Sequence, residues 1–243
     1  MPVIGCDCAV CASDDPRDAR LRTSALLRAP GGNVLVDCGP DARQQLLRAG
    51  VRELAGVLLT HEHNDHVIGL DDLRPFMFRQ RSPVTLYAEA RVLASVRERF
   101  GYAFAERPYP GAPRFELREI AAGDTLELAG THVEALRVEH GRLPILGFRV
   151  GDLAYLTDAK TLPETTLARL GGLATLVLSA LHHTQHHSHL TLAEAVALAR
   201  RIGARRTYFI HASHAMGLHA AVDAELPAGL ALAYDGLAVE VTV

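Results

Sequence analysis

The chain lacks several features that would place it in a specialised class of protein. In its 243 residues no apolar run approaches the roughly 18 residues that a membrane-spanning helix needs. A strong excess of one charge is also missing, because 25 basic and 28 acidic residues give a formal net charge of −3. These absences argue against a membrane-spanning helix and against a surface that binds nucleic acid or another polyanion.

Cysteine is scarce and unevenly placed. Four cysteines in a chain of 243 residues do not make a disulfide framework. Cys6, Cys8 and Cys11 crowd the first dozen residues, whereas Cys38 stands alone. Metal ligation is the better hypothesis for the first three, and Cys38 is expected to be a small buried side chain.

No sequence pattern typical of a signal peptide or of a domain linker is found. No positively charged region precedes an apolar stretch at the N-terminus, which predicts a cytoplasmic protein without a signal peptide. The most loop-like segment, Pro108–Pro113, is too short to separate domains. We therefore expect one globular domain spanning residues 1–243.

Short β-branched segments alternate with helical ones along the chain. The patterns predict an α/β protein whose sheet faces are covered by helices. Strands are expected at 34–36, 57–60, 84–87, 132–138, 145–150, 153–157, 174–179 and 207–210, with two more in 230–243 joined at Asp235-Gly236. Helices are expected at 42–49, 88–100 and 191–202, the last opened by a capping box of Thr191 and Glu194.

The most informative segment is His61-Glu62-His63-Asn64-Asp65-His66. With this composition, an HxHxDH pattern is expected by chance roughly 0.002 times. Residues i and i+2 of an extended segment point the same way, so His61 and His63 can share one metal ion. Asp65 and His66 can face a second metal, and such a donor set suits zinc, manganese or iron.

Other candidate ligands also follow apolar strands directly. Ligand sites of α/β sheets form at the carboxyl ends of their strands. His61, His140, Asp158 and His211 follow the predicted strand segments 57–60, 133–139, 153–157 and 207–210.

With these residues in place, the chain resembles the metallo-β-lactamase-fold hydrolases over nearly its whole length. The resemblance implies an αββα sandwich of two mixed β-sheets with helices on the outer faces. It implies that His61, His63 and His140 hold one metal, that Asp65, His66 and His211 hold another, and that Asp158 bridges them. Asp37, in Val36-Asp37-Cys38-Gly39, matches the supporting aspartate of that family.

The opening Gly5-Cys6-Asp7-Cys8-Ala9-Val10-Cys11 offers three thiolates to a zinc ion that prefers four ligands. His214, three residues past His211, can supply the fourth. This combination of three cysteines and a histidine narrows the resemblance to the PhnP family, the cyclic phosphate phosphodiesterases of the carbon–phosphorus lyase pathway. In that family such residues form a structural zinc site. Reduced surface thiols or a transient disulfide are the alternative.

One departure concerns the N-terminus. Relatives begin with a strand and a glycine-rich loop before the cysteines, whereas this sequence begins at Met1-Pro2-Val3. Either the natural chain starts further upstream or the first sheet lacks its N-terminal edge strand. No expected metal ligand is affected.

The resemblance implies a phosphodiesterase that carries two divalent ions, Mn²⁺ or Zn²⁺, beside one structural Zn²⁺. A hydroxide between the two metals would attack a small cyclic phosphate ester, with 5-phosphoribosyl 1,2-cyclic phosphate as the specific hypothesis. His189 is the expected general acid. Asp65 is expected to be a catalytic residue as well as a metal ligand. A homodimer is compatible with the family.

Three other functions stay open on the sequence alone. They are a ribonuclease Z-like endonuclease, a thioester or lactam hydrolase, and a non-catalytic binding protein like the pyrroloquinoline quinone synthesis protein B. An RNA substrate is disfavoured because no Lys/Gly-rich insertion lies between His66 and His140. His182, His183, His186 and His187 read as a solvated loop, and Lys160 as a solvent-facing side chain.

Overall fold

The structure is a computed structural model that describes residues 1–242. The chain forms two compact units. The terminal unit comprises Met1–Leu21 and Leu136–Val243, and the middle unit comprises Arg22–Ala135. The single domain expected from the sequence stays a prediction.

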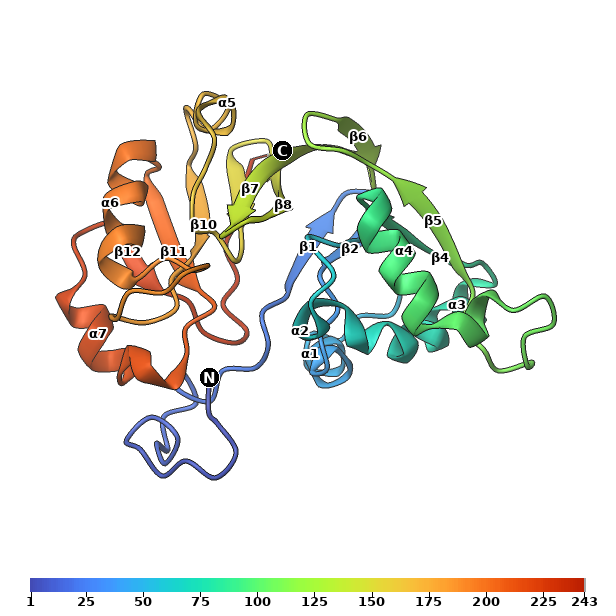
Figure 1. The fold of residues 1–243 in the computed structure, drawn as a ribbon, viewed down its shortest axis with the longest axis horizontal. Coiled ribbons are helices and arrows are strands. Elements are labelled where there is room, and N and C mark those ends of the chain that lie inside the picture. The colour runs from blue at the N-terminus through green and yellow to red at the C-terminus, as the bar shows by residue number, and fades with distance from the viewer. Residues whose placement is uncertain (243) are drawn as a thin grey trace. The chain divides into compact units, whose positions relative to one another are not determined.

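The middle unit is built on a five-stranded sheet of order β1-β2-β3-β4-β5 (Figure 1). β1 pairs antiparallel with β2, and the other neighbours are parallel. The strands are β1 (Ala25–Ala29), β2 (Gly32–Val36), β3 (Gly56–Leu58), β4 (Val84–Ala88) and β5 (Phe115–Glu119). The helices are α1 (Ala42–Arg48), α2 (Asn64–Val67), α3 (Arg74–Gln80) and α4 (Ala90–Arg99), with 3₁₀ turns η1 (Ile68–Leu73) and η2 (Gly101–Phe104).

The core of this unit forms between its sheet and its helices. Val57 of β3 and Leu86 of β4 have no exposed surface and belong to one apolar cluster with Val92 and Val96 of α4. Central parallel strands that are covered on both faces usually consist of consecutive apolar residues. β3 follows this rule, because all three of its residues are buried. β3 can therefore carry the residues that follow it out of a rigid core.

The second sheet has the order β12-β11-β10-β9-β8-β7-β6. β9 to β12 are parallel, whereas the β8–β9 and β6–β7 pairs are antiparallel. The strands are β6 (Thr125–Leu128), β7 (Thr131–His140), β8 (Leu143–Val150), β9 (Leu153–Leu156), β10 (Thr175–Ser179), β11 (Arg206–Ile210) and β12 (Leu230–Leu232). The chain passes from the middle to the terminal unit within β7.

Helices α5 (Glu164–Leu167), α6 (Leu192–Ile202) and α7 (His219–Glu225) and the 3₁₀ turn η3 (His214–Met216) complete the terminal unit. α6 contacts β10, and α7 contacts β12 (Figure 1). The predicted capping box is present: Thr191 Oγ1 accepts from the backbone N–H of Glu194, whose carboxylate accepts from the N–H of Thr191. Leu192, Ala195 and Ala199 form the buried face of the helix, at helical spacing.

The predicted α/β class with two mixed sheets is confirmed, and every strand expected between residues 34 and 210 is present. The tail prediction is wrong in part. Among the described residues after 229, only Leu230–Leu232 form a strand, and Val243 lies outside them. Ala233 to Thr242 instead follow an irregular path. Asp152 N donates to the carbonyl of Thr242, and Thr242 N donates to the carboxylate of Asp152.

Several elements had no clear sequence signal. β1 and β5 are edge strands of the first sheet, and β5 has the polar-rich sequence Phe-Glu-Leu-Arg-Glu, so neither shows a continuous apolar run. α3 and α7 are seven residues long, which is too short for a convincing helical period. A search of the described helices for a segment long and apolar enough to cross a membrane finds none.

Two glycines bring the turn after β2 against the segment that carries Asp65. A Cβ atom on Gly39 would collide with the backbone oxygen of Asp65, and one on Gly69 would collide with that of Gly39. The backbones are joined by hydrogen bonds from Cys38 N to His66 O (2.6 Å) and from Gly69 N to Cys38 O (2.9 Å). This close approach fixes the start of α2 relative to β2.

We predict that Gly69→Ala destabilises the protein by about 2–3 kcal/mol, because the added methyl overpacks a backbone contact. Gly101→Ala is the matched control, since no atom lies within 4 Å of its added Cβ. Urea denaturation followed by circular dichroism measures both. Equal unfolding midpoints for the two variants would contradict the role assigned to this contact.

Candidate metal-binding site

The HxHxDH segment leaves the buried end of β3 and turns into α2. His61 and His66 are buried, whereas His63 is exposed. His61 Nε2 lies 3.0 Å from His63 Nδ1, so the two rings converge as the i, i+2 spacing predicts. Nitrogen ligands of one tetrahedral metal are separated by about 3.3 Å. The pair can therefore share a metal ion.

Asp37 holds two of these histidines in place. Its carboxylate accepts from His66 Nδ1 (2.7 Å) and from the N–H (2.8 Å) and hydroxyl (2.8 Å) of Thr60. The Thr60 oxygen is then the acceptor for His61 Nδ1, at 2.9 Å. With both Nδ1 atoms donating, Nε2 of each ring is the nitrogen that would bind a metal ion, because an acceptor behind a metal-binding histidine orients its ring in this way. The supporting role expected of Asp37 agrees with these contacts.

Asp65 and His66 form the second convergent pair of the middle unit. Asp65 Oδ2 lies 3.6 Å from His66 Nε2, the same atom that the Asp37 contact presents as a ligand. The residues between the ligands are anchored elsewhere, because Glu62 pairs with Arg91 and Asn64 accepts from Arg99, both on α4. Candidate ligands and anchor residues thus alternate from His61 to Asp65.

In the terminal unit, Asp158 is surrounded by histidines. Its Oδ1 lies 3.3 Å from His211 Nε2, and its Oδ2 lies 3.9 Å from both His140 Nε2 and His189 Nδ1. Oxygen and nitrogen ligands of one tetrahedral metal are separated by about 3.4 Å. The two carboxylate oxygens therefore face different imidazoles, which is the arrangement a bridging carboxylate needs.

Three of the candidate residues have an unusual backbone conformation. Asp37, Asp158 and His211 have φ angles of 60°, 51° and 61°. Such left-handed conformations are uncommon for residues with a Cβ and cluster at functional sites. Each of the three comes just after the carboxyl end of a strand: Asp37 follows β2 of the first sheet, and Asp158 and His211 follow β9 and β11 of the second. No pattern in the sequence signals this strain.

His140 and His189 lie close together beside Asp158. His140 Nδ1 donates to the carbonyl of Ser188 (2.8 Å), which presents Nε2 as its ligand atom. His189 Nδ1 is buried and has no hydrogen-bond partner among the described residues. Burial, followed by the nearby imidazoles of His211 and His140, lowers the pKa of His189 to about 3. Ligand atoms of His140, Asp158 and His189 lie within 4.8 Å of one another, so the position of His189 suits a ligand as well as a proton donor.

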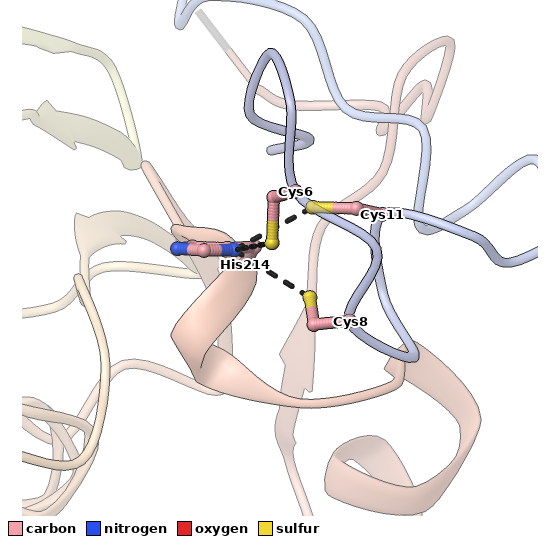
Figure 2. A group of neighbouring side chains, drawn as sticks. All are labelled: Cys6, Cys8, Cys11 and His214. Carbon is pink, nitrogen blue, oxygen red and sulfur yellow. Dashed lines mark hydrogen bonds between the residues drawn. The ribbon is translucent and has the colours of Figure 1, made fainter.

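The predicted cysteine cluster is assembled within the terminal unit, where three thiols surround one imidazole nitrogen (Figure 2). The Sγ atoms of Cys6, Cys8 and Cys11 lie 3.3, 3.5 and 3.5 Å from His214 Nδ1. A tetrahedral zinc, with Zn–S of about 2.3 Å and Zn–N of about 2.0 Å, separates its sulfur and nitrogen ligands by about 3.5 Å. The donor set and its spacing fit zinc.

The thiols of the cluster differ in acidity. Against a lowering hydrogen bond from the backbone of Val3, desolvation and the side-chain hydrogen bonds with Cys8 and Cys6 raise the pKa of the Cys11 thiol. A hydrogen bond from the backbone of Cys11 is the main cause that lowers the pKa of the Cys8 thiol to about 6, so a thiolate forms at neutral pH. Cys38 behaves in the opposite way, because complete burial raises the pKa of its thiol. Cys38 is thus the small buried residue that the sequence predicted.

A buried polar network fastens the cysteine segment to the rest of the terminal unit. Asp18 accepts from the Ser13 hydroxyl (2.8 Å) and from the backbone N–H of His219 (2.7 Å). Arg20 Nη2 donates to His219 Nδ1 (2.8 Å), and its Nε donates to the carbonyl of Ala233 (3.2 Å). The loop that bears the thiols is therefore tied to the start of α7, shortly after His214. The sequence analysis did not find this network.

We predict that Cys8→Ser removes one zinc ion per chain and lowers the free energy of unfolding, because a structural zinc contributes directly to folding. Cys38→Ala is the control and is expected to keep the full zinc content. Elemental analysis of the two purified variants provides the measurement. An unchanged zinc content in Cys8→Ser would show that the cluster does not hold the metal.

Comparison with known proteins identifies the family of this chain. The Beta-lactamase superfamily domain matches residues 32–212. A solved structure described as a new diphosphatase from the PhnP family has 40% identity and a TM-score of 0.91, covering 98% of this chain and 90% of that one.

Two curated relatives are longer than this chain. The octanoyltransferase of Porphyromonas gingivalis (strain ATCC BAA-308 / W83) is 42% identical over 239 residues, 98% of this chain and 48% of that protein. The ribonuclease Z of Mycobacterium sp. (strain KMS) is 30% identical over 184 residues, 68% of this chain and 65% of that protein. The chain spans about half the length of the first of these relatives and less than two thirds of the second. The superfamily match, the PhnP-family diphosphatase and the ribonuclease Z relative indicate a metal-dependent hydrolase. The chain belongs to the beta-lactamase superfamily and, within it, to the PhnP family.

Proposed function

We propose that this chain is a dinuclear-metal phosphodiesterase that hydrolyses small cyclic phosphate esters, with 5-phosphoribosyl 1,2-cyclic phosphate as the specific substrate. The observation that carries the proposal is the Asp158 carboxylate, whose two oxygens face His211 on one side and His140 on the other. A carboxylate placed in this way suits two cations at once.

The metals proposed are two divalent ions, Mn²⁺ or Zn²⁺. The first would be held by His61, His63 and His140, and the second by Asp65, His66 and His211, with Asp158 shared between them. The geometry inside each unit supports the donor pairs His61–His63, Asp65–His66 and Asp158–His211. A third ion, Zn²⁺, is proposed for Cys6, Cys8, Cys11 and His214.

Once bound, two metal ions supply a nucleophile from water at neutral pH and stabilise the negative charge that develops on the phosphoryl oxygens. The protein itself orients the donors. Asp37 sets the ring of His66, Thr60 sets that of His61, and the carbonyl of Ser188 sets that of His140. Preorganised ligands of this kind need no rearrangement during the reaction.

The leaving alkoxide needs a proton, and His189 is proposed to supply it. Its Nδ1 lies 3.9 Å from the Asp158 carboxylate, so the ring stands next to the proposed bridging group. Without the metals, burial lowers the pKa of His189 to about 3. We therefore propose that the negative charge of the bound phosphate ester favours protonation of this ring, as an opposite charge nearby does.

A diphosphatase activity is the second candidate, because the PhnP-family neighbour with 40% identity is described as a diphosphatase. Hydrolysis of a diphosphate is also attack on a phosphoryl group and would use the same residues. A ribonuclease Z activity has support from the mycobacterial relative, but the net charge of −3 does not favour a polyanionic substrate. A small-molecule substrate in the cytoplasm is the proposal we adopt.

We predict that His189→Ala keeps its metals but turns over bis(p-nitrophenyl) phosphate about 10²- to 10⁴-fold more slowly with added manganese, as expected for loss of a general acid. Asp158→Ala is expected to lose both metal and activity. Metal content and turnover are measured on the same samples. Metal loss in His189→Ala would make this residue a ligand and contradict the general-acid role.

The wild-type assay tests the function itself. Turnover of bis(p-nitrophenyl) phosphate by the metal-loaded protein is the expected result. A metal-loaded protein that leaves this diester intact but hydrolyses a thioester or a lactam would overturn the phosphodiesterase proposal.

A further inference from the structure

We propose that Lys160 is a positioning residue for His189, the proposed general acid, and that it acts through an ion pair with Glu194. Lys160 lies two residues after Asp158. Glu194 lies in the first turn of α6, whose N-cap is two residues after His189. The inference rests on the proposed function, because it concerns the same reaction and the same site.

The imidazole of His189 lacks a hydrogen bond at Nδ1 that would fix its orientation. This nitrogen is buried and has no hydrogen-bond partner among the described residues, whereas Nδ1 of His140 donates to the carbonyl of Ser188 (2.8 Å). His189 Nδ1 lies 3.9 Å from Asp158 Oδ2. That distance therefore depends on how the two backbone segments that carry these residues are joined.

One contact joins the two segments directly. The backbone N–H of Leu190, the residue after His189, donates to the carbonyl of Ala159 at 3.0 Å. Ala159 in turn follows Asp158. A single hydrogen bond fixes one distance but leaves the segments free to rotate about it. A second contact is needed to fix the angle at which His189 faces Asp158.

The ion pair provides this second contact. Lys160 Nζ donates to both carboxylate oxygens of Glu194 at 3.1 Å. The same carboxylate accepts from the backbone N–H of Thr191 (2.8 Å), two residues after His189. The carboxylate therefore joins the segment that follows Asp158 to the segment that follows His189.

Lys160 is itself held in place. Its backbone N–H donates to the carbonyl of Glu139 (2.8 Å), whose own N–H donates to the carbonyl of Thr161 (3.0 Å). The side chain of Lys160 is 18% exposed, so the solvent-facing position expected from the sequence is wrong. Partial burial reduces the screening that makes exposed ion pairs ineffective. The pair can therefore hold the start of α6 against the segment that carries Asp158.

The ion pair and the helix cap are separate functions of Glu194. The capping box needs only Thr191 and Glu194, and Thr191 Oγ1 accepts from the N–H of Glu194 at 3.1 Å. Removing the ammonium group of Lys160 therefore leaves the cap of α6 in place. A misplacement of about 1 Å can lower a reaction rate about 100-fold. Loss of the pair is thus expected to lower the rate rather than the binding of substrate.

The first test is Lys160→Met, which keeps an unbranched side chain but removes its charge. For the metal-loaded protein we expect kcat with bis(p-nitrophenyl) phosphate to fall about 10-fold and KM to change less than about twofold. The metal content should stay that of the wild type. Lys160→Arg keeps a cation and should retain most of the rate.

Arg201→Met is the matched control, because it removes an ion pair near the other end of the same helix. Arg201 Nη2 donates to the two carboxylate oxygens of Glu164 at 2.8 and 2.9 Å. Its loss should change kcat less than about twofold. An undiminished kcat in Lys160→Met, or an equal loss in Arg201→Met, would overturn the proposal.

A double-mutant cycle shows whether Lys160 acts through His189. Lys160→Met is introduced into His189→Ala, and kcat is compared with that of His189→Ala alone. If Lys160 positions the imidazole, its loss has less than about a twofold effect once the imidazole is gone, because the two changes remove one function. The same 10-fold loss in both backgrounds would give the ion pair a general structural role and contradict the proposal.

Crystal structures of the metal-loaded variants separate this inference from the proposed function. If the wild type hydrolyses no diester, the proposed function fails, yet the position of the His189 ring still decides the role of Lys160. A ring that moves by about 1 Å or more from Asp158 in Lys160→Met, but not in Lys160→Arg or Arg201→Met, supports the proposal. An unmoved ring in Lys160→Met contradicts it.

Discussion

The buried carboxylate of Asp158 is the group on which the proposed chemistry depends. It is 2% exposed and has a left-handed backbone at the end of β9, with imidazoles facing both of its oxygens. Burying a carboxylate is costly unless cations or strong donors compensate for the lost water. Divalent metals held by the surrounding histidines would supply that compensation. The strained backbone and the buried charge then have the same explanation.

The two kinds of metal site are built in different ways. The cysteine cluster gathers four ligands from two distant segments of the terminal unit, and the Asp18–Arg20–His219 network ties these segments together. The candidate histidine and aspartate ligands instead follow individual strands, and the rings of three of the histidines are oriented by hydrogen bonds that Asp37, Thr60 and Ser188 accept. The first arrangement suits a structural ion. The second holds these rings in a fixed orientation, as the ligands of a catalytic metal need.

The sequence predicted the elements whose signal is local and strong. Apolar strands ending in a ligand, such as Thr207–Ile210 before His211, and the capping box of Thr191 were recognisable because their patterns follow from backbone geometry. The edge strand Phe115–Glu119 and the irregular tail after Leu232 were not, since pairing and burial at an edge depend on neighbours that sequence periodicity does not reveal. The cysteine cluster was predicted from residue type and spacing. The left-handed φ of His211 and the contacts of Asp18 and Arg20 with His219 have no local sequence signal, so only the structure shows them.

Anomalous difference maps, recorded at the zinc and manganese absorption edges from crystals grown with both metals, test the dinuclear proposal most directly. Three peaks are predicted: one zinc peak at the Cys6, Cys8, Cys11 and His214 cluster, and two peaks on either side of the Asp158 carboxylate. A single peak at the cysteine cluster, with none at Asp158, would contradict the proposal that this chain is a dinuclear-metal hydrolase.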